Sequence, residues 1–201
     1  MHVYTYLALG DSYTIGEGVS LTDSFPYQVV QLLRNQEFDF NAPEIIAKTG
    51  WTTDELQAAI GKATLLSKYD FVTLLIGVND QYRGRDIMEY KEQFEELLKK
   101  AIEMANGKKD RVIVVSIPDY SVTPHGRSLE PEKVSKEIEV FNGVNKALSI
   151  QYKVLYADVT AGSREAANDQ SLIAGDGLHP SEKEYRKWAE KTVELIALQL
   201  K

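Results

Sequence analysis

The sequence predicts an α/β fold, a three-layer α/β/α sandwich around a five-stranded parallel sheet, and three observations support this. Apolar runs of strand length alternate along the chain with longer segments whose apolar residues recur at helical spacing. Glycine, Asp or Asn follows several of the runs, as expected where buried strands end in loops. A chain of 201 residues, 43% of them hydrophobic, also suffices for one domain with a sizeable core. We therefore expect a single domain over residues 1–201.

Five apolar runs are the expected strands. The run at 71–76 is continuously apolar between Asp70 and Gly77, which is typical of a strand buried on both faces. Successive strands separated by helices pair in parallel through right-handed crossovers, and we expect the order 2-1-3-4-5, with the first strand between the second and third. The strands are expected at Val3–Leu9, Glu44–Lys48, Phe71–Ile76, Arg111–Ile117 and Lys153–Ala157.

Two helices of the amino-terminal half are placed by the residues that begin them. Pro26 suits the first turn of a helix that reaches about Arg34, because proline needs no hydrogen-bond partner for its nitrogen there. Thr53 is expected to cap a helix that begins at about Asp54.

The later helices carry similar signals. Asp86 is expected to begin a long helix, with Glu89 as its capping-box partner, and Pro131 opens another that runs to about Ile150. Ser181 and Glu184 form a second capping-box pattern before the last helix. The segments 10–18, 119–130 and 158–175 are expected to be irregular loops.

Composition excludes several classes of function. A net charge of −7 and a pI near 5.1 argue against nucleic acid or an anionic membrane as the main partner. Cysteine is absent, which excludes disulfides and thiol catalysis, and three scattered histidines without a His-Glu-x-x-His pattern do not suggest a metal site. No apolar run approaches the roughly 18 residues of a membrane span. The first nine residues contain no Lys or Arg, so we expect a cytoplasmic protein without a signal peptide.

Candidate catalytic residues lie in the loops that follow four of the five expected strands. Ser12 follows the first strand, Gly50 the second and Asn79 the third, so the order 2-1-3 brings all three to one edge of the sheet. Asp176 and His179 follow the fifth strand, about 15 Å from the first. The segment 158–175 is long enough to cross that gap.

These residue types include the groups that catalysis by a serine nucleophile needs. A serine hydroxyl attacks well only when a base within hydrogen-bond reach takes its proton, and a neutral imidazole, here that of His179, is such a base. Asp176, three residues earlier across a glycine turn, is able to hold one tautomer of the ring and to stabilise the imidazolium. At Gly50, the missing side chain lets the backbone approach a substrate closely.

Four sequence blocks together resemble those of the SGNH, or GDSL-type, hydrolases. The blocks span residues 10–180 in the family's order, and the one departure is Tyr13 where the family's motif has leucine. The blocks are Gly10-Asp11-Ser12, Gly50 within Thr49-Gly50-Trp51-Thr52-Thr53, Gly77-Val78-Asn79-Asp80, and Asp176-Gly177-Leu178-His179-Pro180.

The resemblance implies a flavodoxin-like SGNH-hydrolase fold and a catalytic triad of Ser12, His179 and Asp176 that works without metal or cofactor. It further implies an oxyanion hole formed by the backbone N–H groups of Ser12 and Gly50 and the side-chain amide of Asn79. The expected substrate is a small-molecule, lipid or carbohydrate ester, or a thioester, cleaved through an acyl-enzyme.

Alternatives remain open at this stage. The same triad would serve a carbohydrate O-deacetylase or a lysophospholipase, and a flavodoxin-like module that binds a small ligand without catalysis is an alternative of another class. Against that module, the segment 10–18 lacks the Gly-Lys-Ser/Thr ending of a phosphate loop. An α/β-hydrolase is disfavoured because Thr14, not glycine, stands two residues after Ser12.

Other residues near this edge receive structural or secondary roles. Asp11 and Asp80 are expected to bond loop backbone, and Arg83 and Arg85 to be solvated. Five aromatic residues are candidates for the wall of an acyl pocket: Phe25, Trp51, Tyr82, Tyr120 and His125.

Overall fold

Five short strands form one parallel sheet in the computed structural model, which describes residues 2–200. The order is β2-β1-β3-β4-β5 and every neighbouring pair is parallel, so the predicted topology is confirmed. β1 and β3 are buried along their whole length, as their apolar sequences require of central strands covered on both faces. The strands are β1 (Tyr6–Gly10), β2 (Glu44–Ala47), β3 (Phe71–Leu75), β4 (Val112–Val115) and β5 (Leu155–Ala157).

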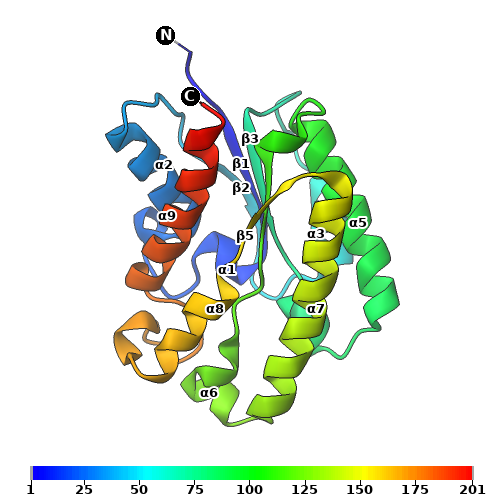
Figure 1. Cartoon of the computed structure of the whole chain (residues 1–201), viewed down its shortest axis with the longest axis vertical. Helices are drawn as coiled ribbons and strands as arrows, with labels where there is room; N and C mark the ends of the chain where they lie inside the picture. The colour runs from blue at the N-terminus through cyan, green and yellow to red at the C-terminus, as the bar shows by residue number, and fades with distance from the viewer. Residues whose placement is uncertain (1, 201) are drawn as a thin grey trace.

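Long helices cover both faces of the sheet and complete the predicted three-layer sandwich (Figure 1). One layer consists of α2 (Phe25–Asn35) and α9 (Glu182–Leu198), which pack against each other although they come from opposite ends of the chain. The other layer consists of α3 (Thr53–Ile60), α5 (Ile87–Met104) and α7 (Pro131–Tyr152). The first and last long helices therefore share one layer.

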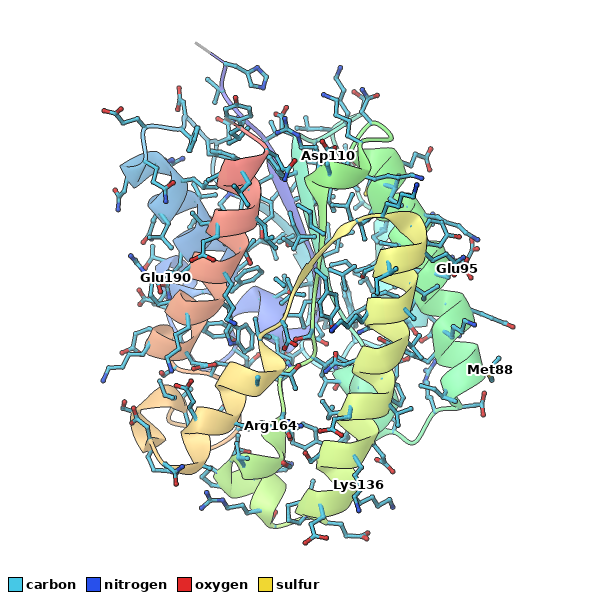
Figure 2. All side chains as sticks on the ribbon, in the orientation of Figure 1. Met88, Glu95, Asp110, Lys136, Arg164 and Glu190 are labelled. Atoms are coloured by element: carbon cyan, nitrogen blue, oxygen red, sulfur yellow. The ribbon has the colours of Figure 1, made fainter. Side chains whose placement is uncertain are left out.

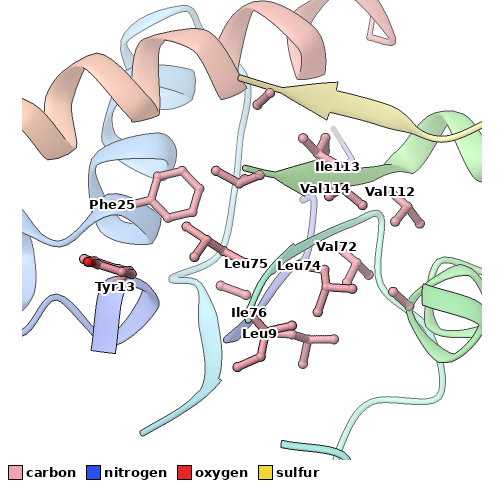
Figure 3. Packing of buried hydrophobic residues seen from close by; sticks show 14 of the residues in the cluster. Leu9, Tyr13, Phe25, Val72, Leu74, Leu75, Ile76, Val112, Ile113 and Val114 are labelled. Atoms are coloured by element: carbon pink, nitrogen blue, oxygen red, sulfur yellow. The ribbon is translucent and has the colours of Figure 1, made fainter. Parts of the chain in front are cut away.

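Both layers present apolar side chains to the sheet and charged side chains to solvent. In Figure 2, Lys136 on α7 and Glu190 on α9 point outward. Figure 3 shows buried apolar side chains of β1, β3 and β4, among them Leu9 and Leu74, with Phe25 of α2 beside Leu75. Burial of each such side chain contributes about 1.5 to 3 kcal/mol. Phe25 is fully buried in this core, so its prediction as a pocket residue is wrong.

The segments expected to be irregular contain short helices. Their first turns are held by Asp side chains, because Asp11, Asp119 and Asp169 each accept a hydrogen bond from the backbone N–H two residues later. Because single Asp side chains hold these short helices, the sequence shows no apolar periodicity that would predict them. These and the other short helices are α1 (Ser12–Ile15), η1 (Leu21–Asp23), α4 (Val78–Tyr82), η2 (Lys109–Arg111), η3 (Tyr120–Val122), α6 (Pro124–Arg127), α8 (Thr160–Ser163), η4 (Arg164–Ala167) and η5 (Gln170–Leu172).

Helix α3 begins one residue earlier than predicted. Thr52, not Thr53, is its N-cap, and the Thr52 backbone N–H donates to Glu55 Oε2 at 3.0 Å. The Thr53 hydroxyl instead donates to Asp80 Oδ1 at 2.8 Å. The residue expected as a cap thus makes a long-range bond that ties α3 to α4.

Two predicted capping boxes do not form. Asp86 caps α5 as expected, accepting from the backbone N–H groups of Met88 and Glu89, but the Glu89 side chain does not return a bond to Asp86. At α9 the Ser181 hydroxyl donates to a carbonyl of the preceding loop at 2.7 Å, while the Glu184 carboxylate accepts from Trp188 Nε1 at 2.9 Å. At α9, a bond from Ser181 to η5 and a bond within the helix thus replace the predicted capping box.

The strands are shorter than the apolar runs that predict them. β1 begins at Tyr6 rather than Val3, and β4 ends at Val115 rather than Ile117. Lys153, the expected start of the last strand, has φ 59° and terminates α7 in the left-handed conformation. No helix within residues 2–200 combines the length and the apolar character needed to cross a bilayer.

Candidate active site

A cavity of about 250 Å³ opens at the carboxyl edge of β1, β2 and β3. It contains four of the five predicted site residues, and the fifth, Asp176, is hydrogen-bonded to one of them. The topology therefore brings residues 12, 50, 79 and 179 together despite their separation in sequence. The lining residues are Ser12, Tyr13, Thr49, Gly50, Val78, Asn79, Tyr82, Tyr120, His125, Leu178 and His179.

Ser12 stands at the first position of α1, directly after a turn that only glycine permits. A Cβ atom on Gly10 would lie 2.1 Å from Thr14 Oγ1 and 2.4 Å from the Leu75 carbonyl oxygen. Asp11 caps α1 by accepting the Tyr13 N–H at 3.0 Å. Ser12 is 5% exposed and its side chain reaches solvent through the cavity.

The Asp11 carboxyl beneath Ser12 is buried. Burial raises its pKa to about 8, an effect to which the nearby Asp80 carboxyl adds and which the Tyr13 N–H opposes. Within residues 2–200, Asp11 Oδ2 has no hydrogen-bond partner. Asp11 and Asp80 both accept backbone N–H groups near the site, as predicted, but these belong to the first turns of α1 and α3 and not to loops.

Asp176 and His179 form a close pair on the loop before α9. His179 Nδ1 lies 2.6 Å from Asp176 Oδ2, and Asp176 Oδ1 accepts the backbone N–H groups of Leu178 and His179 at 2.9 Å each. Partial burial opposes ionisation of Asp176, but these hydrogen bonds outweigh it and lower its pKa. The His125 backbone N–H donates to the Gly177 carbonyl at 3.0 Å and fixes the loop from the other side.

Ser12 and His179 line the same cavity, but within residues 2–200 no hydrogen bond joins the serine hydroxyl to the imidazole. Tyr13 packs against the His179 ring edge-on, with ring centroids 5.7 Å apart and an interplanar angle of 65°. Tyr13 also contacts Trp188 of α9, with ring centroids 5.9 Å apart. The imidazole therefore rests on a side chain adjacent to Ser12.

Three N–H donors are available around Ser12. In the described part of the chain, neither the Ser12 nor the Gly50 backbone N–H donates to a protein acceptor. Gly50 has φ +85°, which side chains other than glycine adopt only with strain. The Asn79 amide donates to the Trp51 carbonyl oxygen at 2.9 Å, and its second hydrogen is unused by that bond.

Side chains from α4 and the residues just after it bond the loop that contains Gly50 and the first turn of α3. Asp80, whose pKa is raised by burial, accepts both the N–H and the hydroxyl of Thr53 at 3.1 and 2.8 Å. Arg83 donates to the Gly50 carbonyl oxygen at 2.7 Å, and Arg85 to Asp54 Oδ1 at 2.8 Å. Arg83 is exposed, as predicted, and Arg85 is half-buried; both also make hydrogen bonds that the sequence analysis did not predict. Nothing in the sequence around Arg83 indicates a backbone carbonyl as its partner.

Tyr82, Tyr120 and His125 form the aromatic part of the cavity wall, as predicted. The Tyr82 ring lies 6.5 Å from that of Tyr120 and 6.4 Å from that of His125. Trp51 is not among the lining residues; it is half-buried and packs against the core. Val78 and Leu178 also line the wall, and they were not predicted because their side chains resemble those of ordinary core residues.

No group of three or more His, Asp or Glu side chains within residues 2–200 is arranged to hold a metal ion. The ionisable groups at the cavity are those described above. The arrangement offers a hydroxyl, an imidazole paired with a carboxylate, and free N–H donors, which together are the groups needed for acyl transfer.

Comparison with known proteins identifies the family of this chain. Residues 8–187 match the GDSL-like lipase/acylhydrolase family. The spore germination lipase LipC of Bacillus licheniformis is 26% identical over 206 residues, covering 92% of this chain and 93% of LipC.

Solved structures share the fold over nearly the whole chain. A lipase/acylhydrolase from Enterococcus faecalis superposes with a TM-score of 0.78 at 20% identity, covering 98% of this chain and 96% of the other. Axe2, an acetylxylan esterase from Geobacillus stearothermophilus, gives a TM-score of 0.74 at 20% identity, covering 96% and 94%. The chain therefore belongs to the GDSL-like lipase/acylhydrolase family and is a hydrolase of ester bonds.

Proposed function

We propose that the protein cleaves carboxylic esters through an acyl-enzyme on Ser12, with His179 as the base and Asp176 as the acid that orients it. The observation that carries the proposal is the 2.6 Å contact between His179 Nδ1 and Asp176 Oδ2 at the cavity that Ser12 lines. With Nδ1–H bonded to the carboxylate, Nε2 is the basic nitrogen. Asp176 keeps its charge at neutral pH because its pKa is lowered.

In the first half of the reaction, Ser12 Oγ attacks the ester carbonyl while His179 Nε2 takes the hydroxyl proton. The N–H groups of Ser12 and Gly50 and the Asn79 amide stabilise the oxyanion, each donor contributing about 3 to 4 kcal/mol. The intermediate then expels the alcohol, which takes the proton from His179. Water, deprotonated by the same imidazole, attacks the acyl-enzyme and releases the acid.

The size and lining of the cavity favour a short acyl group. A cavity of about 250 Å³ lies below the range of roughly 300 to 1,000 Å³ that holds drug-sized ligands, and its wall is largely aromatic and aliphatic. Acetyl and other short-chain esters fit this volume. The printed functions of LipC and Axe2, a lipase and an acetylxylan esterase, support ester hydrolysis as the reaction class.

A carbohydrate acetyl ester is the second candidate substrate, and one observation favours it. Tyr82 is 55% exposed at the cavity, where its ring is available to stack on a sugar ring. A comparison of acetylated xylooligosaccharides with simple alkyl acetates of equal acyl length separates the two candidates. If the protein is a carbohydrate deacetylase, kcat/KM should be higher for the sugar esters than for the alkyl acetates. If it is a simple esterase, kcat/KM should be no higher for the sugar esters.

The Ser12→Ala variant tests the proposed nucleophile. Hydrolysis of a short-chain nitrophenyl ester is expected to fall at least about a thousandfold, because loss of a triad member removes the covalent route. The exposed Ser20, on the following loop, provides the matched control Ser20→Ala, which should keep the parent rate. A Ser12→Ala protein as active as this control would contradict the proposal.

A further inference from the structure

We propose that Arg83 is a positioning residue for the oxyanion hole, acting through the backbone of Gly50. The inference rests on the proposed function, because it assigns the Gly50 N–H to the oxyanion. Arg83 itself is absent from the cavity lining, and its guanidinium donates to the Gly50 carbonyl oxygen at 2.7 Å. It therefore contacts the donor residue rather than the substrate.

The loop that contains Gly50 has little internal support. Residues 48–51 form a turn closed by one backbone bond of 3.2 Å, from the Trp51 N–H to the Lys48 carbonyl. Gly50 occupies the third position of this turn with φ +85°, as a type II turn requires. Glycine has the fewest conformational restrictions of any residue, so the direction of its N–H depends on what holds its neighbours.

External bonds supply that support; the Thr49 hydroxyl donates to the Glu17 carboxylate, and the other bonds come from α4 and the residue that ends it. Asn79 holds the Trp51 carbonyl at 2.9 Å, Asp80 holds the Thr53 N–H at 3.1 Å, and Arg83 holds the Gly50 carbonyl. Asn79 lies in the first turn of α4 and Arg83 is the residue that ends this helix, so both anchors belong to one short segment. Of these three side chains, Arg83 is the one that bonds Gly50 itself, the residue whose N–H is the proposed donor. Its removal leaves Gly50 without a hydrogen bond to any side chain in residues 2–200.

A second contact orients the guanidinium. Arg83 Nη1 lies 3.4 Å from Glu55 Oε2 in the first turn of α3, while Nη2 bonds the Gly50 carbonyl. The Arg83 side chain is 45% exposed, so the ion pair with Glu55 contributes little to stability. The planar guanidinium of arginine suits a positioning role, because its N–H groups bond the Gly50 carbonyl and the Glu55 carboxylate at a fixed angle to each other.

The Arg83→Ala variant tests the inference by separating kcat from KM. A misdirected Gly50 N–H weakens an interaction made in the transition state, so kcat should fall about 10- to 100-fold while KM stays within twofold. The affinity of a boronic acid that forms a tetrahedral adduct with Ser12 should fall in parallel with kcat/KM. Guanidinium ions at millimolar concentration should restore part of the lost rate, which a general structural defect would not allow.

Arg85→Ala is the matched control. Arg85 lies two residues away and also bonds the first turn of α3, through Asp54, but it does not contact the Gly50 loop backbone through its side chain. Its replacement should leave kcat within twofold of the parent. If Arg83→Ala lowers the melting temperature, Arg83→Met, which retains the aliphatic stem, replaces it in the same comparison.

Three results would overturn the inference. These are an Arg83→Ala protein with the kcat of Arg85→Ala, a loss confined to KM, or no recovery with guanidinium. Failure of the proposed function is distinguishable, because in that case the parent protein itself would show no hydrolysis dependent on Ser12.

Discussion

At the scale of single residues, the buried carboxyl of Asp11 is the most unusual ionisable group near the site. Its pKa is raised from 3.8 to about 8, with burial as the main cause. Between these values the folded protein holds a proton that the unfolded chain has released. The contribution of Asp11 to the unfolding free energy therefore decreases as the pH rises from about 4 to about 8, where the folded carboxyl is half ionised.

Asp11→Asn should remove this pH dependence. Asn replaces the protonated carboxyl with a neutral group of similar shape and keeps an oxygen for the Tyr13 N–H. The melting temperature of the variant relative to the parent should rise from pH 4 to pH 8 and then level off. Asp110→Asn, at an exposed position far from the site, controls for the loss of one charge. A difference between Asp11→Asn and the parent that is constant across this pH range would contradict the assignment.

Residue roles were predictable from sequence only where chemistry or local spacing determines them. The contact between Asp176 and His179 follows from a three-residue separation across Gly177. Arg83 was not predictable, because its partner is a backbone carbonyl 33 positions away and carries no side-chain signature. The catalytic roles of Ser12 and its partners stay predictions until they are measured.

At the scale of elements, the junction between β3 and α4 positions Asn79 and depends on Gly77. Gly77 has φ +125°, and a Cβ atom there would lie 2.4 Å from the hydroxyl oxygen of Tyr90, which is itself fully buried. Tyr90 donates to Asn145 Oδ1 at 2.7 Å and is not free to move away. Both the backbone conformation and the space at this junction therefore require glycine.

Gly77→Ala should lower the unfolding free energy by about 3 kcal/mol, from backbone strain together with the forced shift of Tyr90. Gly143→Ala is the matched control. Gly143 lies within α7 with open space around its Cβ position, so alanine there should raise the unfolding free energy by about 0.5 to 1 kcal/mol. Urea denaturation measures both. Equal effects at the two positions would show that the junction tolerates a side chain.

Long elements were easier to predict from the sequence than short ones. The long helices and the strand order were predicted because apolar periodicity and crossover rules act over many residues. The one-turn helices in the segments 119–130 and 158–175 were missed, since single Asp caps and turn bonds determine them. The capping box at Ser181 did not form because the Ser181 hydroxyl bonds a carbonyl of η5 and the Glu184 carboxylate bonds Trp188 one turn further along α9.

At the scale of the whole molecule, the fold brings the two ends of the chain to one site. Ser12 follows the first strand, while His179 precedes α9, which packs against α2 in the same layer. Tyr13, next to Ser12, contacts both His179 and Trp188, so the nucleophile and the imidazole are linked through the packing of α1 against α9. The proposed activity therefore requires the complete sheet together with α2 and α9, the first and last long helices.

The most direct test of this account is the site and rate of covalent labelling by an alkyl phosphonate ester. The parent protein should gain one adduct, located on Ser12 by peptide mass spectrometry, and His179→Ala should form it at least about a hundredfold more slowly because the base is missing. An adduct on another residue, or equal labelling rates with and without the His179 imidazole, would contradict the central claim that these two side chains act together.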